Sequence, residues 1–200
     1  MKSSITIVAF FICGILVGLF SLLPKFLLDP RLSNYALYIL MFFVGISIGS
    51  GKSIWKVIKK AKFKILLVPI TVIMGTFLGV AVVSIFLPEI NLRESLAVGS
   101  GFGYYSLSSI FINRLHGEVL GVIALISNIL RETITLLLTP LMLKHFGKLA
   151  PIASGGATSM DTTLPIITKF SGKEYAIISV FNGTVLTILV PFLVTFILTI

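Results

Sequence analysis

Apolar segments long enough to cross a membrane recur through this sequence, separated by short polar turns, and no other feature constrains the fold as strongly. Of the 200 residues, 56% are hydrophobic and 12% are charged, whereas about a quarter of the residues in a soluble domain are charged. A helix needs about 20 apolar residues to span the hydrocarbon core of a bilayer. We therefore predict an all-α polytopic membrane protein, a single integral membrane domain over residues 1–200, with about seven membrane segments: 1–23, 35–51, 65–87, 95–113, 119–143, 150–168 and 175–200.

The basic residues lie mainly in the turns between these segments, although the net charge is +9. One loop, at residues 52–64, holds six lysines, which is the positive-inside pattern of a cytoplasmic connection. This distribution favours a lipid bilayer, and not nucleic acid, as the partner of the positive charge. If all seven segments cross, the N-terminus is cytoplasmic and the C-terminus is outside. Lys144 and Lys148 then fall on the outer side against the charge rule, and a re-entrant segment would change the count and the orientation.

The segment at residues 150–168 does not have the composition of a regular lipid-facing helix. Its centre holds adjacent glycines, a proline at position 165 and the carboxylate of Asp161. Glycine lowers helix stability and proline removes a backbone donor. Irregular backbone at membrane depth survives only where protein buries it or water reaches it. We predict a discontinuous or re-entrant element that lines a polar cavity.

The segment at residues 95–113 is the second irregular one, with glycines at positions 99, 101 and 103 followed by Tyr104, Tyr105 and Ser106. Broken helices expose backbone N–H groups that suit a substrate carboxylate. Close helix packing is the open alternative for the glycines and tyrosines. The predicted cavity lining of the two irregular segments and the final span comprises Tyr104, Tyr105, Ser106, Gly155, Gly156, Thr158, Ser159 and Asn182.

Three polar residues lie close to the middle of the segment at 119–143. Asn128 and Glu132 share a helix face at i,i+4 spacing, and Arg131 lies beside them. An unpaired charge at that depth costs ~2.5–3.5 kcal/mol on insertion scales. Adjacent residues point about 100° apart on a helix, so Arg131 and Glu132 are expected to find partners on other helices. A purely structural lock between helices is the alternative to a transport role.

Glu132 and Asp161 are the two carboxylates that fall inside membrane segments. If both face one cavity, they could bind a cation and exchange it for a proton, because both ligands compete for the same oxygens. That competition is the minimum that an antiporter requires. A helix N-cap is the alternative role for Asp161.

Enzyme chemistry and metal binding find little support. The sequence lacks the HExxH and GxxxxGK[ST] patterns of common enzyme classes. The two histidines, His116 and His145, lie at segment ends without spaced metal partners, and Cys13 is the single cysteine. We expect a non-enzymatic protein without a cofactor or a bound metal.

Three motifs in order along the C-terminal half are GFGYYSLSSI at 101–110, ISNILRE at 126–132 and GGATSMDTTLP at 155–165. Together they resemble the lysine exporter LysO family of bacterial and archaeal membrane proteins. The resemblance implies export of L-lysine, and of its toxic analogue thialysine, across the inner or plasma membrane. It also implies that the intramembrane acids, here Glu132 and Asp161, are central to transport.

Longer members of that family carry an additional hydrophobic portion ahead of this domain. The resemblance therefore raises the expectation that a separate small membrane protein supplies those spans, or that they are dispensable. The residues alone fit a monovalent cation/proton antiporter, or a subunit of one, equally well, and coupling to Na⁺ in place of protons is open. A non-transporting scaffold is the remaining alternative, against which the cost of the intramembrane charges argues.

Overall fold

The computed structural model describes residues 63–200 continuously, with side chains from residue 65, and residues 13, 16–20, 32, 35, 39, 42 and 46 individually. The chain forms two compact units, residues 1–49 and 50–200. Apart from those single residues, the predicted spans at 1–23 and 35–51 lie outside the described residues, as does nearly all of the lysine-rich loop.

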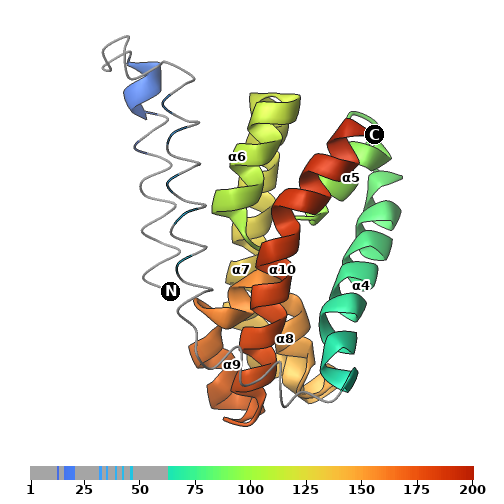
Figure 1. Ribbon diagram of the computed structural model, residues 1–200, viewed down its shortest axis with the longest axis vertical. Helices are drawn as coiled ribbons and strands as arrows, with labels where there is room; N and C mark the ends of the chain where they lie inside the picture. The colour runs from blue at the N-terminus through green and yellow to red at the C-terminus, as the bar shows by residue number, and fades with distance from the viewer. Residues whose placement is uncertain are drawn as a thin grey trace. The chain divides into compact units, whose positions relative to one another are not determined.

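The described part of the second unit is entirely helical, which confirms the all-α prediction (Figure 1). Its elements are η2 Phe63–Leu66, α4 Leu67–Ser84, α5 Leu92–Gly99, α6 Tyr105–His116, α7 Glu118–Phe146, α8 Ala150–Gly155, η3 Gly156–Met160, α9 Leu164–Ser171 and α10 Tyr175–Thr199. Among the described residues, α4, α7 and α10 are long and apolar enough to cross a membrane. The count of seven membrane segments stays a prediction.

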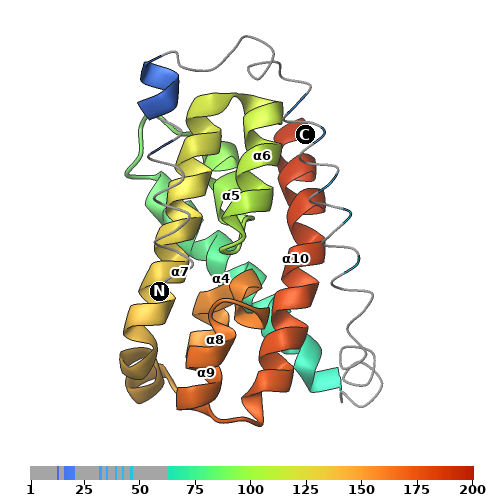
Figure 2. The ribbon, with the colours of Figure 1, turned by 90° about the vertical axis from the view of Figure 1, so that its left-hand side faces the viewer.

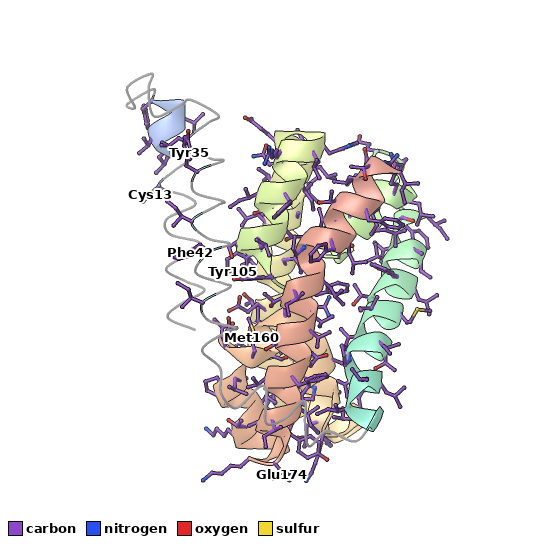
Figure 3. The ribbon with its side chains drawn as sticks, in the orientation of Figure 1. Cys13, Tyr35, Phe42, Tyr105, Met160 and Glu174 are labelled. Carbon is purple, nitrogen blue, oxygen red and sulfur yellow. The ribbon has the colours of Figure 1, made fainter. Side chains whose placement is uncertain are left out.

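Helix α5 ends and α6 begins within the predicted irregular segment 95–113, and α8, η3 and α9 fall within 150–171. Figures 1 and 2 both show α5 and α6 in the half of this unit that holds the C-terminus, and α8 and α9 in the opposite half. Each pair is therefore a hairpin whose tip points toward the middle of the long helices. In Figure 3, Tyr105 and Met160 lie near mid-height, whereas Glu174 lies at the end that holds α9.

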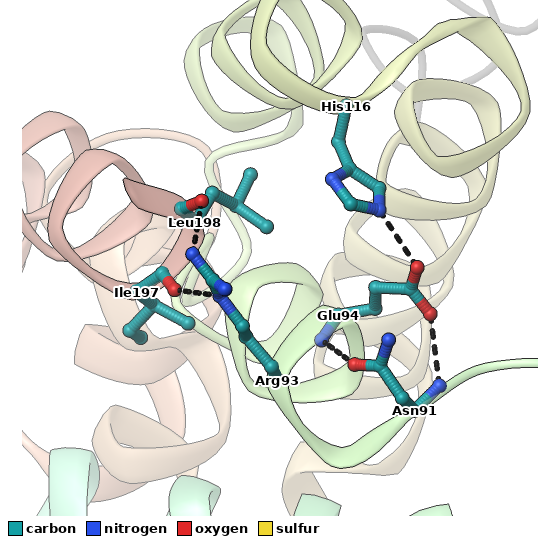
Figure 4. A network of polar contacts seen from close by, with 6 residues as sticks. All are labelled: Asn91, Arg93, Glu94, His116, Ile197 and Leu198. Carbon is teal, nitrogen blue, oxygen red and sulfur yellow. Dashed lines mark hydrogen bonds and ion pairs between the residues drawn. The ribbon is translucent and has the colours of Figure 1, made fainter. Parts of the chain in front are cut away.

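The two ends of the α5–α6 hairpin are joined by polar contacts. Asn91 and Glu94 form a reciprocal capping box that starts α5, with both hydrogen bonds 2.8 Å long. A second oxygen of the Glu94 carboxylate lies 2.7 Å from Nε2 of His116, in the last turn of α6 (Figure 4). Arg93 donates to the carbonyls of Ile197 and Leu198 at the end of α10. Residues 91–94 and His116 therefore lie at the same end of the unit as the C-terminus.

The α8–α9 hairpin closes in a corresponding way at the other end. Nζ of Lys148, just before α8, lies 3.7 Å from the carboxylate of Glu174, just after α9. The same ammonium lies 5.5 Å above the ring of Tyr175, the first residue of α10. Both pairs are at the surface and contribute little to stability. They show, however, that the chain leaves α9 at the same end of the unit at which it enters α8.

The interior of this unit holds many polar side chains among its apolar ones, and its surface exposes many large apolar side chains, which is unusual for a soluble domain. Four polar residues are 0% exposed, namely Thr135, Thr139, Ser179 and Asn182, whereas Val119 and Phe86 are each 77% exposed. Hydrocarbon can cover such a surface, whereas water would disfavour it by ~25 cal/mol per Å² of apolar area. The packing therefore agrees with the membrane prediction made from the apolar segments.

Candidate functional site

The two hairpin tips touch one another at the middle of the unit. The backbone N–H of Ala157 donates to the carbonyl of Phe102 over 2.8 Å. Phe102 has φ 46° and Gly156 has φ 58°, conformations that place both tips in tight turns. A Cβ added at Gly156 would lie 2.2 Å from the Phe102 oxygen, and one at Gly103 would lie 3.1 Å from the Gly155 oxygen. Glycine is required here because the two backbones cross in contact.

Asn128 of α7 holds the tip of the α5–α6 hairpin. Its side chain is 3% exposed, and Oδ1 accepts from the N–H of Gly103 over 2.7 Å. Nδ2 donates to the carbonyl of Ala124 over 2.8 Å and, less closely, to that of Val98 over 3.3 Å. The Asn128 amide oxygen therefore provides an acceptor for the Gly103 N–H, a backbone group at the break between α5 and α6.

Arg131, one turn further along α7, holds the tip of the other hairpin. Nε donates to the Ser154 carbonyl over 2.9 Å and a terminal nitrogen donates to the Ala153 carbonyl over 3.0 Å. These carbonyls end α8, where the helix dipole is negative and favours a cation. The other terminal nitrogen lies 3.3 Å from the Thr76 hydroxyl of α4. Arg131 thus has partners on other helices, as predicted.

A buried polar seam joins η3 to α10. The Ser159 hydroxyl, 0% exposed, lies 2.7 Å from the carbonyl oxygen of Gly156 and 2.9 Å from that of Ser179, and its single hydrogen can be donated to either. The Ser179 hydroxyl donates back to the Ser159 carbonyl. Nδ2 of Asn182 donates to the Gly156 carbonyl over 3.1 Å. Gly183 permits this approach, because a Cβ there would lie 2.6 Å from the Ala157 oxygen. The predicted residues Ser159, Gly156 and Asn182 are therefore brought together.

The two predicted acids come from different elements. Glu132 of α7 is 1% exposed. Asp161 follows η3 and is exposed on this unit, and its carboxylate accepts from the N–H and hydroxyl of Thr162 over 2.5 and 3.3 Å. The N-cap residue of α9 is Thr163, so the structure does not give Asp161 the N-cap position. The phenol of Tyr105 lies within electrostatic reach of both carboxylates.

The remaining predicted residues occupy the hairpin tips. Tyr104 precedes α6 and lies within electrostatic reach of Asp161, and Ser106 follows in the first turn of α6. The Thr158 hydroxyl is buried and donates to the carbonyl of Gly155 over 2.9 Å. All three therefore lie at the hairpin tips, within the two predicted irregular segments, and their role in lining a cavity stays a prediction.

Several residues of the crossing were not predicted. Thr76 meets Arg131, Thr135 pairs with the Ser154 hydroxyl at 2.7 Å, and the Thr163 hydroxyl donates to the Thr158 carbonyl over 3.0 Å. Ser179 pairs with Ser159 across 20 residues of sequence. A signal existed for Thr135 and Ser179, which lie one helical turn from Arg131 and Asn182 respectively. Phe102 carried no such signal, since its role uses only its backbone carbonyl.

Comparison with known proteins gives a family match over nearly the whole chain. The family model described as "Lysine exporter LysO" matches residues 8–198. The protein named "Lysine exporter LysO" of Escherichia coli (strain K12) is 32% identical over 165 residues, which are 82% of this chain and 54% of that relative. This chain therefore spans about half the length of that relative.

A second relative is closer in length. The protein named "Putative lysine exporter" of Haemophilus influenzae (strain ATCC 51907 / DSM 11121 / KW20 / Rd) is 36% identical over 187 residues, covering 92% of this chain and 93% of the relative. No solved structure matches the chain.

Proposed function

This chain belongs to the lysine exporter LysO family, and on that premise we propose that it exports L-lysine and analogues such as thialysine from the cytoplasm across the inner or plasma membrane. The observation that carries the proposal is the meeting of two interrupted hairpins, Phe102 against Ala157, beside Arg131 and Glu132 of a long apolar helix. Secondary transporters build substrate sites from broken helices that meet near the bilayer midplane.

In the proposed topology both hairpins are re-entrant and enter the membrane from opposite faces. The pairing of Glu94 with His116 and of Lys148 with Glu174 supports this arrangement, because each contact joins the two ends of one hairpin. Helices α4, α7 and α10 then cross, together with the two spans predicted before them. This gives five crossings in place of seven, and it keeps the N-terminus cytoplasmic and the C-terminus outside.

The charge distribution supports the same topology. With both hairpins re-entrant, Lys144 and Lys148 move to the cytoplasmic side with Lys169, Lys173 and the lysine-rich loop, and Arg114 moves to the outer side with Arg93. The two lysines that contradicted the positive-inside rule in a seven-crossing arrangement then obey it. The order α4, hairpin, α7, hairpin is also that of two helix–hairpin units of opposite orientation, the kind of inverted repeat on which alternating access depends.

The proposed mechanism is lysine/proton antiport at the carboxylates of Glu132 and Asp161. The ε-ammonium of lysine binds Glu132 or Asp161, and a proton arriving from outside displaces it, so that each exported lysine is exchanged for proton uptake. Asn128 and Arg131 hold the two tips together, while Tyr105 lies close enough to both acids to influence the bound cation. The backbone at Gly155 and Gly156 can adjust as the tips separate.

Transport of labelled lysine into inside-out vesicles tests this proposal directly. With an imposed pH gradient, we expect accumulation in vesicles that contain the protein and its loss in Glu132→Gln and in Asp161→Asn. Glu89→Gln is the matched control, because Glu89 is an exposed carboxylate in the turn between α4 and α5. Full exchange in either acid variant would contradict the mechanism.

The same assay distinguishes lysine export from the alternative function, that of a monovalent cation/proton antiporter or its subunit. Accumulation of labelled Na⁺ without accumulation of lysine would favour the cation antiporter. Lysine accumulation driven by a Na⁺ gradient alone would show that Na⁺, and not the proton, is the coupling ion. If vesicles with this chain alone fail, co-expression with a small membrane protein that supplies further spans distinguishes an incomplete transporter from a scaffold.

A further inference from the structure

A cavity of about 270 Å³ lies between α4, α5 and α7. Its walls are mostly apolar, with Val80 and Val83 from α4, Val98 from α5 and Ile123 from α7. Neither Glu132 nor Asp161 lines it. The cavity is close to the lower size of small-ligand pockets, about 300 Å³, so it suits a molecule no larger than an amino acid.

The cavity leads from one end of the unit to the hairpin crossing. Leu87 and Ile90, in the turn between α4 and α5, line its outer part, whereas Thr76, Asn128 and Arg131 line its inner part. The turn at residues 85–91 lies at the end that holds the C-terminus (Figure 1). In the proposed topology that end is the outer side, so the cavity is the outward branch of the transport path.

The inner end of the cavity is suited to an anionic group. Arg131 makes its hydrogen bonds to two backbone carbonyls and a threonine hydroxyl, and no carboxylate among the described residues forms an ion pair with it. A cation at membrane depth is stabilised by an anion nearby, and a guanidinium binds carboxylates well.

A second observation, independent of Arg131, also points to a ligand. Ser95 lines the cavity and is 6% exposed, and its hydroxyl has no hydrogen-bond partner in the described part of the chain. Leaving a buried hydroxyl without a partner is unfavourable. A bound polar group would satisfy it, and the hydroxyl of Ser127 on the facing wall is available to the same ligand.

We propose that this cavity binds the α-carboxylate end of the amino-acid substrate at Arg131, with the aliphatic side chain along Val80, Val98 and Ile123, on the outward half of the path. The inference rests on the proposed lysine export and adds a subsite to it. A free fatty acid could present the same carboxylate chemistry, and the test below separates the two sources.

Two glycines of α4 provide a matched pair of probes. A Cβ at Gly79 or at Gly75 would meet nothing within 4 Å, and both residues are exposed, but only Gly79 lines the cavity. In a background of Cys13→Ala, which removes the single native cysteine, Gly79→Cys and Gly75→Cys are treated with a membrane-impermeant maleimide from the outer side. We expect labelling of Gly79→Cys and none of Gly75→Cys.

Ligand protection then identifies the chemistry. L-lysine and L-norleucine, which share the α-carboxylate, should slow labelling of Gly79→Cys, and cadaverine, which lacks a carboxylate, should not. Absence of labelling, absence of protection by lysine, or equal protection by cadaverine would overturn the proposal. Protection by octanoate without protection by norleucine would assign the cavity to a fatty acid and also overturn it.

The second measurement is lysine transport by variants in which a leucine side chain replaces one of the two glycines. Gly79→Leu should reduce lysine export about tenfold or more, the loss expected when a charge-assisted hydrogen bond is denied to the substrate, whereas Gly75→Leu should retain it. If the parent protein exports lysine and Gly79→Leu does so equally, this inference fails and the proposed function stands. If the parent exports no lysine, either alone or co-expressed with the small membrane protein, but protection is seen, the subsite stands and the proposed function fails.

Discussion

The crossing of the two hairpin tips can be tested by a single methyl group at Gly156. This residue has φ 58° and ψ −121°, a region that glycine adopts and other residues avoid at a cost of about 1–3 kcal/mol. The added Cβ would also lie 2.2 Å from the Phe102 oxygen, which forces the tips apart and breaks the Ala157 hydrogen bond, worth about 0.5–1.5 kcal/mol. Together these terms predict that Gly156→Ala destabilises the protein by roughly 2–4 kcal/mol.

Gly75→Ala is the matched control for that substitution. Gly75 lies within α4, where a Cβ meets nothing, and alanine is favoured over glycine in a helix by up to about 1 kcal/mol. Thermal denaturation of the detergent-purified variants, followed by loss of the monodisperse peak, should rank Gly156→Ala below the parent and Gly75→Ala at or above it. A Gly156→Ala variant as stable as the parent, with full lysine export, would refute the direct contact of the two tips.

Further substitutions probe the contacts that hold the two hairpins. Asn128→Leu leaves the buried N–H of Gly103 without its acceptor and should lower stability by about 1–3 kcal/mol in the same denaturation assay. Arg131→Lys keeps the charge but loses the forked contact with two carbonyls, so we expect reduced stability and at least a partial loss of export, and unchanged values would contradict a tip-holding role. Hydrogen bonds from the Asn91 backbone and from His116 hold the pKa of Glu94 below its usual range. The ionised Glu94 carboxylate therefore stabilises the fold in full above about pH 4.3. This stabilisation is lost as the pH falls through the lower pKa that Glu94 has in the folded state. Melting temperatures measured from pH 6 down to pH 3 should therefore fall less steeply in Glu94→Gln than in the parent, and parallel curves would count against this contact.

The places where the helices break could be predicted from local composition. Adjacent glycines and Pro165 predicted an interruption within 150–168, and the structure begins α9 at Leu164 with that proline in its first turn, where the missing N–H costs nothing. The long helices were also predictable, since α7 and α10 begin within one residue of their predicted starts at 119 and 175. Periodicity and turn residues are local properties, so one sequence suffices for them.

The path of each irregular segment could not be predicted in the same way. Residues 92–116 as a continuous helix would be about 37 Å long at 1.5 Å per residue, enough to cross a bilayer, so hydropathy does not distinguish a broken crossing from a hairpin. The distinction rests on contacts between residues far apart, such as Glu94 with His116 across 22 positions and Ser159 with Ser179 across 20. Such pairs leave no local pattern in the sequence.

The arrangement around α7 explains why this helix carries its polar residues where it does. Asn128 and Arg131 face different hairpins, one accepting from the tip of α5–α6 and the other donating to the end of α8, and both tips are held to the same turn of one helix. Glu132 is buried and adjacent to Arg131, so in the proposed mechanism a movement of either tip would change the surroundings of this acid. Binding of a cation or a proton at Glu132 would therefore act on the same turn that keeps the tips together. That coupling is what an exchanger needs, because only a ligand that binds two states differently can shift the balance between them.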